Sequence, residues 1–193
     1  DDVVSRGEFA HYIVKLMRWD QITPTNDYNF MDISADTPYI NSITTAISMG
    51  FMHGNGDGTF RPSEPILQGQ ALRVMIDLLG YGRAANQEGG YPVGYLATAS
   101  RLQLLENIEL TYPMVYGEFT NFLVKCLEVD LMEKVEADSY EIREGVTLLS
   151  KHLKLNKKQG VITADSFTAI DSSYAREGGI CLDGHFYYYD KPT

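Results

Sequence analysis

An amphipathic helix pattern that occurs three times constrains this chain more than any other sequence feature. Apolar residues at i, i+3, i+4, i+7 and i+8 form one helical face in residues 9–17, 71–79 and 119–127. Five positions that match three times indicate an internal repeat, whose copies bury their apolar faces against one another. We therefore expect these helices to share a core. The matched residues are Phe9, Tyr12, Ile13, Leu16 and Met17; Ala71, Val74, Met75, Leu78 and Leu79; and Phe119, Phe122, Leu123, Cys126 and Leu127.

The segment before each of these helices also repeats. Residues 4–8 read Val-Ser-Arg-Gly-Glu, residues 66–70 read Ile-Leu-Gln-Gly-Gln, and residues 114–118 read Met-Val-Tyr-Gly-Glu. Ser5 and Glu8 fit a capping box, in which each side chain accepts a hydrogen bond from the backbone N–H of the other residue. The later copies have no hydroxyl at the cap position, and a lost cap costs about 1 kcal/mol. The three copies have therefore diverged.

A second helical pattern precedes the later two copies. It contains Ile40, Ile43, Ala46 and Met49, and it recurs 53 residues later as Val93, Leu96, Ala99 and Leu102. The combined patterns predict five helices separated by turn-rich linkers. The expected helices are 5–18, 38–50, 68–80, 93–105 and 116–128, and the expected linkers are 20–37, 53–66, 80–92 and 106–115.

Charge and composition exclude several classes of protein. The 193 residues carry a formal net charge of -10. Residues 1–82 hold 10 acidic and 5 basic residues and residues 83–193 hold 16 and 11, so each part nets -5. A nucleic-acid partner would require a basic face, and a membrane span would require about 20 consecutive apolar residues. We expect neither partner. The acidic start at Asp1 and Asp2 does not match a signal peptide, although a trimmed chain would look the same.

The reactive side chains form no recognisable active site. The four histidines and the serines lack a nucleophile or metal motif, and two cysteines give neither a disulfide framework nor zinc spacing. The turn at residues 54–58 is glycine-rich, but a calcium loop would need Glu at position 12, where Ile66 or Gln68 stands. A phosphate loop would need a Gly-Lys-Ser/Thr motif. We expect a tight turn, with no catalytic residue, no metal site and no cofactor.

The residues on both sides of the second helical pattern carry a family resemblance. Residues 30–33 read Phe-x-Asp-Ile, residues 39–40 read Tyr-Ile, and residues 50–62 read Gly-Phe-Met-x-Gly-Asn-Gly-Asp-Gly-Thr-Phe-x-Pro. Together with the cap segment and helix that follow it in the sequence, this run resembles the S-layer homology repeat of bacterial surface proteins. Nearly a whole repeat lies in residues 30–81, the second half of an earlier one in residues 4–18, and a third with a shortened loop in residues 91–128.

The resemblance, together with the change of residue pattern after position 130, predicts an α+β chain in two domains. Residues 1–130 would form a mainly helical domain of three repeats with pseudo-threefold symmetry, and residues 131–193 a small β-rich module. Clefts between repeats of this family bind an anionic secondary cell-wall polysaccharide, often pyruvylated, and hold the protein on the extracellular face of the bacterial cell wall. Other surface-layer subunits are further expected partners.

The family's cap segment typically reads Ile-Thr-Arg-Ala-Glu, and its arginine grips the glycan. Here the arginine remains as Arg6, while Gln68 and Tyr116 occupy the equivalent places. A guanidinium at the first turn of a helix suits a carboxylate such as pyruvate. At most one of the three expected sites therefore keeps its cation.

The remaining candidate site residues come from the same run and its neighbours. Tyr39 stands where many members have Trp, and its ring or that of Trp19 can stack on a sugar. Asp32 completes the candidate glycan-binding set with Arg6. Two structural alternatives stay open: an ion pair between Arg6 and Asp32, and core packing of Tyr39.

The C-terminal residues have a different pattern. Residues 140–156 fit a short helix or an extended stretch, and the β-branched residues of 161–170 predict a strand. Residues 180–189 predict a hairpin, because Asp183-Gly184 suits a type I′ turn. So small a module has edges that pair with more chain or with a partner.

Three functions remain open from the sequence. The first is a non-catalytic module that anchors a surface protein to the wall glycan. The second is a scaffold for surface-layer assembly that has lost glycan binding, which the replacement of arginine by Gln68 and Tyr116 favours. The third is an accessory module of a wall-active enzyme.

Overall fold

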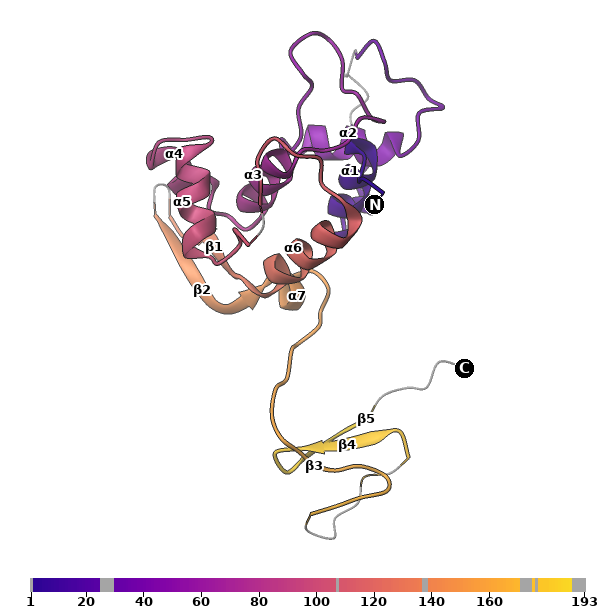
Figure 1. The fold of residues 1–193 in the computed structure, drawn as a ribbon, viewed down its shortest axis with the longest axis vertical. Helices are drawn as coiled ribbons and strands as arrows, with labels where there is room; N and C mark the ends of the chain where they lie inside the picture. Colours follow the sequence, from indigo (N-terminus) through magenta and orange to yellow (C-terminus); the bar gives the residue numbers. More distant parts are fainter. Residues whose placement is uncertain are drawn as a thin grey trace. The chain divides into compact units, whose positions relative to one another are not determined.

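The computed structural model describes residues 2–24, 30–106, 108–136, 139–170, 175 and 177–188. Contacts divide the chain into two units, Asp1–Leu155 and Asn156–Thr193, and helices and strands both contribute, as the predicted class requires. The first unit (Figure 1) contains α1 (Arg6–Leu16), the 3₁₀ turn η1 (Trp19–Gln21), α2 (Ile40–Ser48), α3 (Gln68–Leu78), α4 (Gly82–Gln87), α5 (Val93–Arg101), α6 (Tyr116–Glu128), β1 (Asp130–Lys134), β2 (Tyr140–Thr147) and α7 (Leu148–Lys151). The second unit contains β3 (Ile162–Ala164), β4 (Gly179–Leu182) and β5 (His185–Tyr188).

All five predicted helices are present as α1, α2, α3, α5 and α6. The additional helix α4 lies in a predicted linker and was missed. It has six residues, Gly-Arg-Ala-Ala-Asn-Gln, which are too few to show a helical apolar stripe.

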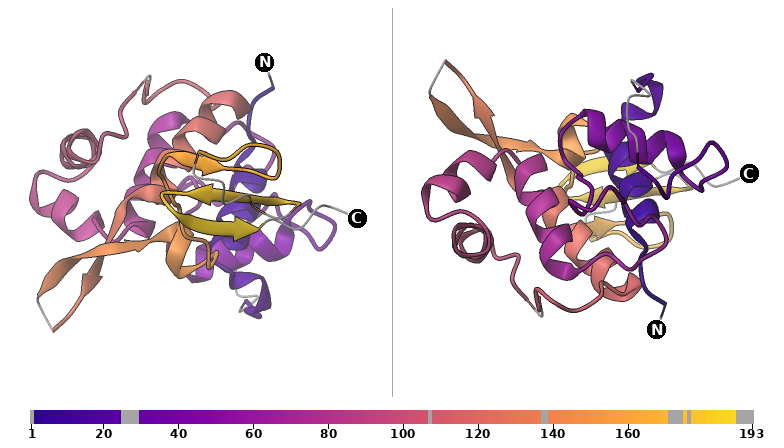
Figure 2. Two further views of the ribbon diagram at one scale, coloured as in Figure 1. Left: turned by 90° about the horizontal axis from the view of Figure 1, so that it is seen from below. Right: turned by 90° about the horizontal axis from the view of Figure 1, so that it is seen from above.

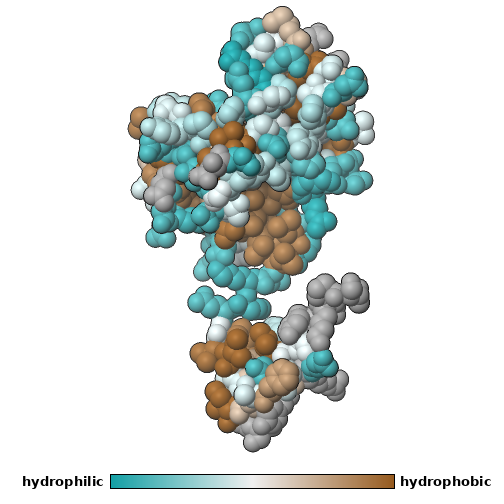
Figure 3. Space-filling view, turned by 45° about the vertical axis from the view of Figure 1, so that its right-hand side comes forward, coloured by the Kyte–Doolittle hydropathy of each residue, from teal (hydrophilic) through white to brown (hydrophobic). Residues whose placement is uncertain are grey.

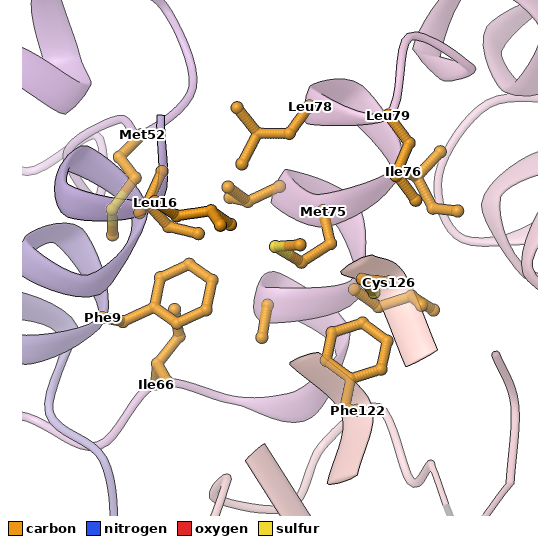
Figure 4. Packing of buried hydrophobic residues seen from close by; sticks show 14 of the residues in the cluster. Phe9, Leu16, Met52, Ile66, Met75, Ile76, Leu78, Leu79, Phe122 and Cys126 are labelled. Carbon is orange, nitrogen blue, oxygen red and sulfur yellow. The ribbon is translucent and has the colours of Figure 1, made fainter. Parts of the chain in front are cut away.

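The repeated apolar stripe forms the core of the first unit, as predicted. Figure 4 shows Phe9 and Leu16 of α1, Met75 of α3 and Cys126 of α6 converging on one region. The equivalent residues Leu16, Leu78 and Cys126 are 8%, 7% and 0% exposed. Tyr12 departs from the pattern, because it is 38% exposed and packs its ring 5.4 Å from that of Phe119 at the edge of the core.

The three cap segments are joined by a closed ring of backbone hydrogen bonds. The N–H of Val4 donates to the Met114 carbonyl at 2.8 Å, Met114 donates to Ile66 at 2.8 Å, and Ile66 donates back to Val4 at 2.9 Å. All three side chains are fully buried. Each cap segment therefore satisfies the backbone of the next. A second set of bonds, two residues further on, runs around the ring in the opposite sense: the N–H of Arg6 donates to Glu64 at 2.9 Å, that of Gln68 to Tyr112 at 2.9 Å, and that of Tyr116 to Asp2 at 3.1 Å.

The hairpin β1–β2 packs against the end of α3. The Met132 N–H donates to the Leu79 carbonyl at 2.9 Å, and the Tyr81 hydroxyl donates to the Asp130 carbonyl at 2.9 Å. Gly80 has φ +90°, and a Cβ there would lie 1.8 Å from the Met132 carbonyl oxygen, so this approach requires glycine. The other end of the hairpin projects from the helices of its unit in both views of Figure 2.

The position of this hairpin affects where the chain divides. A division by sequence pattern falls between residues 130 and 131, whereas the division by contacts falls after Leu155. Residues 140–156 contain both of the structures that the sequence allowed, first the strand β2 and then the short helix α7.

The second unit is a three-stranded antiparallel sheet in the order β3-β4-β5. The predicted hairpin is confirmed, because Asp183 and Gly184 have φ of 48° and 82°, as a type I′ turn requires. The strand predicted over residues 161–170 is wrong beyond Ala164. There the Asp165 carboxylate accepts hydrogen bonds from the N–H groups of Phe167 and Thr168, at 2.7 and 2.6 Å, and turns the chain.

Candidate functional site

The Arg6 side chain is buried and joins three parts of the first unit. Its Nε donates to the Phe60 carbonyl and its Nη2 to the His53 carbonyl, both at 2.9 Å, while Nη1 lies 3.4 Å from Oε1 of Gln70. The guanidinium lies 4.7 Å from the centre of the Phe60 ring. Burial lowers the pKa of Arg6, and the nearby Glu64 carboxylate partly offsets this decrease. The guanidinium remains protonated, because arginine does not lose its proton in proteins.

Arg6 also lines a pocket that we call the α3 pocket. The pocket has a volume of about 170 Å³ and lies between α3 and the turn at residues 50–55. Gln70, Arg73 and Asp77 contribute its polar wall, since positions i, i+3 and i+7 share one face of a helix. The remaining lining residues are Gly50, Phe51, Met52, His53, Gly54, Asn55, Ile66 and Val74.

The charges in the α3 pocket come from different repeats. Arg6 belongs to the first cap segment, whereas Arg73 and Asp77 belong to α3. Arg73 is exposed to solvent. The Asp77 carboxylate accepts a hydrogen bond from the Tyr95 hydroxyl at 2.8 Å, and burial raises the pKa of Asp77 despite that bond. The pocket thus offers two cations and one carboxylate.

The other predicted site residues do not line the α3 pocket. Asp32 accepts hydrogen bonds from the N–H groups of Phe60 and Arg61, at 2.9 and 2.6 Å, and so holds the backbone to which Arg6 also binds. This geometry is not the ion pair between Arg6 and Asp32 considered from the sequence. Asp32 therefore positions the loop rather than facing the pocket.

The two predicted aromatic residues lie in different places. Trp19 stacks on Phe51 with ring centres 5.2 Å apart, so it supports one wall of the α3 pocket. Tyr39 is 42% exposed and lies with its ring 5.0 Å from His11, and both residues line a separate pocket of about 360 Å³ between α1 and α2. The structure thus places Arg6 in the α3 pocket, Trp19 against Phe51 of its wall, and Tyr39 in a separate pocket.

Sequence reasoning missed Gln70, Arg73 and Asp77. Their signal was present as a polar stripe at i, i+3 and i+7 beside the apolar stripe of the same helix. That stripe borders a pocket only because the 50–55 turn packs against α3, and no local sequence pattern predicts this tertiary contact.

An equivalent pocket, which we call the α6 pocket, lies one repeat further on. Its α6 residues Glu118, Asn121, Phe122 and Lys125 are those of the α3 pocket shifted by 48 positions, and it measures about 390 Å³. Lys125 forms an ion pair with Glu106, which also lines the pocket. The α6 pocket therefore contains two carboxylates and one paired cation. Leu104, Ile108 and Val124 complete its lining.

Gln68 occupies the place of Arg6 beside the α6 pocket, and protein groups bind its amide. Its Nε2 donates to the Glu118 carboxylate at 2.8 Å, and its Oε1 accepts from the Glu109 N–H at 2.7 Å. At the third equivalent place the Tyr116 hydroxyl donates to Glu8 at 2.8 Å, which raises the pKa of Tyr116. Each cap side chain thus reaches the helix of the next copy, but only Arg6 brings a charge.

The predicted capping box is confirmed at the first helix. The Ser5 N–H lies 2.9 Å from the Glu8 carboxylate, and the Glu8 N–H lies 3.2 Å from the Ser5 hydroxyl. The bond from the Ser5 backbone is the largest cause of the lowered pKa of Glu8. Half of the box survives in the second copy, where Gln70 accepts from the Leu67 N–H at 3.1 Å.

The glycine-rich turn is held by its own side chains. Asp57 accepts hydrogen bonds from the Thr59 hydroxyl at 2.6 Å and from its N–H at 3.0 Å, and pairs with Arg61 at 2.7 Å. These interactions lower the pKa of Asp57 to about 2. Within the described ranges, no three His, Cys, Asp or Glu side chains are grouped to hold a metal ion, and no helix is long and apolar enough to cross a membrane.

Residues 29–72 match the S-layer homology domain family, which confirms the resemblance predicted from the sequence. The chain is 26% identical over 93% of its length to the middle cell wall protein of Brevibacillus brevis. It is 26% identical over 78% to a cell surface protein of Thermoanaerobacter kivui, and 25% identical over 80% to a surface layer protein of Brevibacillus choshinensis.

These relatives are much longer proteins. The chain spans 16%, 19% and 14% of their respective lengths. The family match and the names of the relatives confirm the predicted location at the bacterial cell surface.

Proposed function

We propose that the first unit anchors its protein at the cell surface by binding an anionic secondary cell-wall polysaccharide in the α3 pocket. The observation that carries the proposal is the meeting of Arg6 and Arg73, from two different repeats, in one pocket. The role is structural and non-enzymatic. The three linked cap segments further support a pseudo-threefold arrangement of the repeats.

The α3 pocket can contact both an acidic group and a sugar hydroxyl. Within the described chain, three of the five Arg6 N–H groups donate to protein acceptors, which leaves two for a ligand. Arg73 is exposed at the mouth of the pocket and supplies a second cation. A ligand carboxylate suits the planar guanidinium groups, and the Asp77 carboxylate accepts from a hydroxyl. A ketal-pyruvate substituent on a sugar provides this combination.

The proposal limits binding to one anionic group per chain. The α6 pocket contains the carboxylates of Glu106 and Glu118, so it repels a second acidic substituent. The third equivalent place has the uncharged Tyr116 bound to Glu8. Binding at one place only makes the affinity of a single chain for the wall moderate, and several chains in one layer then add their contacts.

One observation favours the alternative, a surface-layer scaffold without glycan binding. Arg6 is only 6% exposed and already serves to hold the 53–60 segment. Its role would then be structural, like that of Gln68 in the next copy. The two functions differ in whether Arg73, which the structure leaves exposed, contributes to wall binding.

Sedimentation with purified cell walls, before and after removal of the secondary polymer, tests the proposal. We expect Arg73→Gln to weaken binding about tenfold and Arg6→Ala to cost about 1.5–3 kcal/mol, as for a charged hydrogen bond. Arg101→Gln removes the same charge outside the pocket, where Arg101 pairs with Glu88 at 2.7 Å, and should leave binding unchanged. Replacing Gln68 should have much less effect than replacing Arg6.

Two outcomes would move the conclusion to the scaffold. One is equal binding by the wild type, Arg73→Gln and Arg6→Ala; the other is binding that survives removal of the polymer. Salt provides an independent check, because the net charge of -10 repels a polyanion at long range. Moderate salt should therefore preserve or slightly improve binding, whereas binding by a basic protein would collapse. Walls stripped of pyruvate test the substituent itself.

A further inference from the structure

The second unit exposes an unusual number of large apolar side chains. On β5, Tyr188 is 59% exposed, Phe186 42% and Tyr187 37%. In Figure 3 apolar side chains gather on the smaller body, which is this unit. Exposed apolar area concentrated on so small a unit indicates an interaction surface rather than a free face.

The two edges of the sheet in this unit differ. The outer edge of β3 is covered by its own chain, because the Ile170 N–H donates to the Thr163 carbonyl at 2.9 Å and Ala164 bridges Ala169. At the other edge, the described part of the unit pairs β5 with β4 alone. An unpaired strand edge is a template for another strand.

At two residues of β5 the backbone groups point away from β4. Because the turn has two residues, Leu182 and His185 form the first hydrogen-bonded pair, and the pairs alternate from there. The N–H and C=O groups of Phe186 and Tyr188 therefore face away from β4. All four residues of β5 are exposed.

The charges of the unit favour a second copy of this chain as the partner strand. Edge strands of monomeric proteins are commonly blocked by charged residues or proline, and β5 reads His-Phe-Tyr-Tyr. Residues 156–193 hold five acidic and four basic residues and net -1, whereas residues 1–155 net -9. Two copies can thus approach through this unit with little repulsion, while their first units repel.

We infer that two copies of the chain associate by antiparallel pairing of β5 with β5. The result is a continuous sheet with three strands from each copy and a twofold axis between the β5 strands. Aromatic side chains of one β5 then lie opposite aromatic side chains of the other, which is a favourable cross-strand pairing. This interface is independent of the α3 pocket and of its glycan.

The test is sedimentation velocity of the full chain over a concentration series. The wild type should show a monomer–dimer equilibrium. The double variant Phe186→Lys/Tyr188→Lys should raise the dissociation constant at least about tenfold, or about 1.4 kcal/mol, because like charges then face each other at the new edge. The matched control is Phe167→Lys, which adds charge at an exposed apolar residue outside the strands and should change the constant by less than about twofold.

Hydrogen exchange keeps the inference testable if the double variant perturbs the unit. In the wild type, the amides of Phe186 and Tyr188 should become more protected as the chain is concentrated, while the turn amide of Gly184 should not change. If the chain were a monomer at every concentration, the inference would be overturned, and a strand of another protein would become the candidate partner for the β5 edge. An equal loss of dimer in the Phe167→Lys control would overturn it as well, in favour of unspecific apolar contact.

Discussion

Replacing glycine by alanine at three equivalent positions should change stability in opposite directions. Gly7, Gly69 and Gly117 each occupy the second position of a repeated helix, and alanine is the better helix former in all three. A Cβ at Gly117 would meet no heavy atom within 4 Å. A Cβ at Gly69 would lie 2.5 Å from Oη of Tyr91 and 2.9 Å from the Leu110 carbonyl oxygen.

The magnitudes follow from these contacts. Gly117→Ala reduces the entropy of the unfolded chain without strain, so it should stabilise by about 0.5 kcal/mol. In Gly69→Ala the Leu110 backbone must move, which weakens the 3.1 Å hydrogen bond from the Gly69 N–H at a cost of about 1 kcal/mol. Overpacking adds about 1–3 kcal/mol. We therefore expect Gly69→Ala to destabilise the first unit by about 2 kcal/mol.

Urea unfolding followed by tryptophan fluorescence measures both variants. Trp19 is the one tryptophan of the chain and lies in the first unit, so its emission reports on that unit alone. The effect of Gly7→Ala on the free energy of unfolding should lie between those of the other two variants, because its Cβ would lie 3.1 Å from the Pro62 carbonyl oxygen. If Gly69→Ala and Gly117→Ala changed the free energy of unfolding in the same direction, the contacts between cap segments would not limit the size of the side chain at this position.

Two further predictions concern buried titratable groups. Burial raises the pKa of Asp77, so its protonation as the pH falls should remove a negative charge beside Arg6 and Arg73 and strengthen wall binding. Because the folded pKa is the higher one, stability should also fall as the pH rises through it. Asp77→Asn should lose both pH dependences, which sedimentation and urea unfolding measure over a pH series that starts below 3.8, the ordinary pKa of an aspartate. Burial likewise raises the pKa of the Cys126 thiol, so in a Cys181→Ser background a disulfide reagent should react with Cys126 only upon unfolding. Rapid labelling of the native chain would contradict this.

The elements predicted from the sequence are those with a strong local pattern. The five helices follow from their apolar stripes, and the β4–β5 hairpin follows from Asp183-Gly184. The hairpin β1–β2 has no such pattern, and Leu131 is the single buried residue among the described residues of its strands. Its position depends on strand pairing and on the close approach to Gly80, which joins segments far apart in the chain.

The candidate site was predictable to the same extent. The repeated cap segment aligns Arg6 with Gln68 and Tyr116, and the family resemblance singles out Arg6 as a candidate site residue. Arg73 and Asp77 become part of the site only when the turn that follows α2 lies against α3. Asp32 shows the opposite case, where a residue within the recognised motif holds backbone instead of facing the pocket.

The ring of hydrogen bonds among Val4, Ile66 and Met114 closes with three cap segments and has no place for another. In a linear repeat array each unit contacts only its neighbours, so units can be added or lost at the ends. A ring has no ends at which to do so. A fourth cap segment would find every acceptor occupied, and the loss of one would leave an unpaired donor and an unpaired acceptor in the core. Substitutions that preserve this ring are therefore those that change what each cap segment presents at its surface.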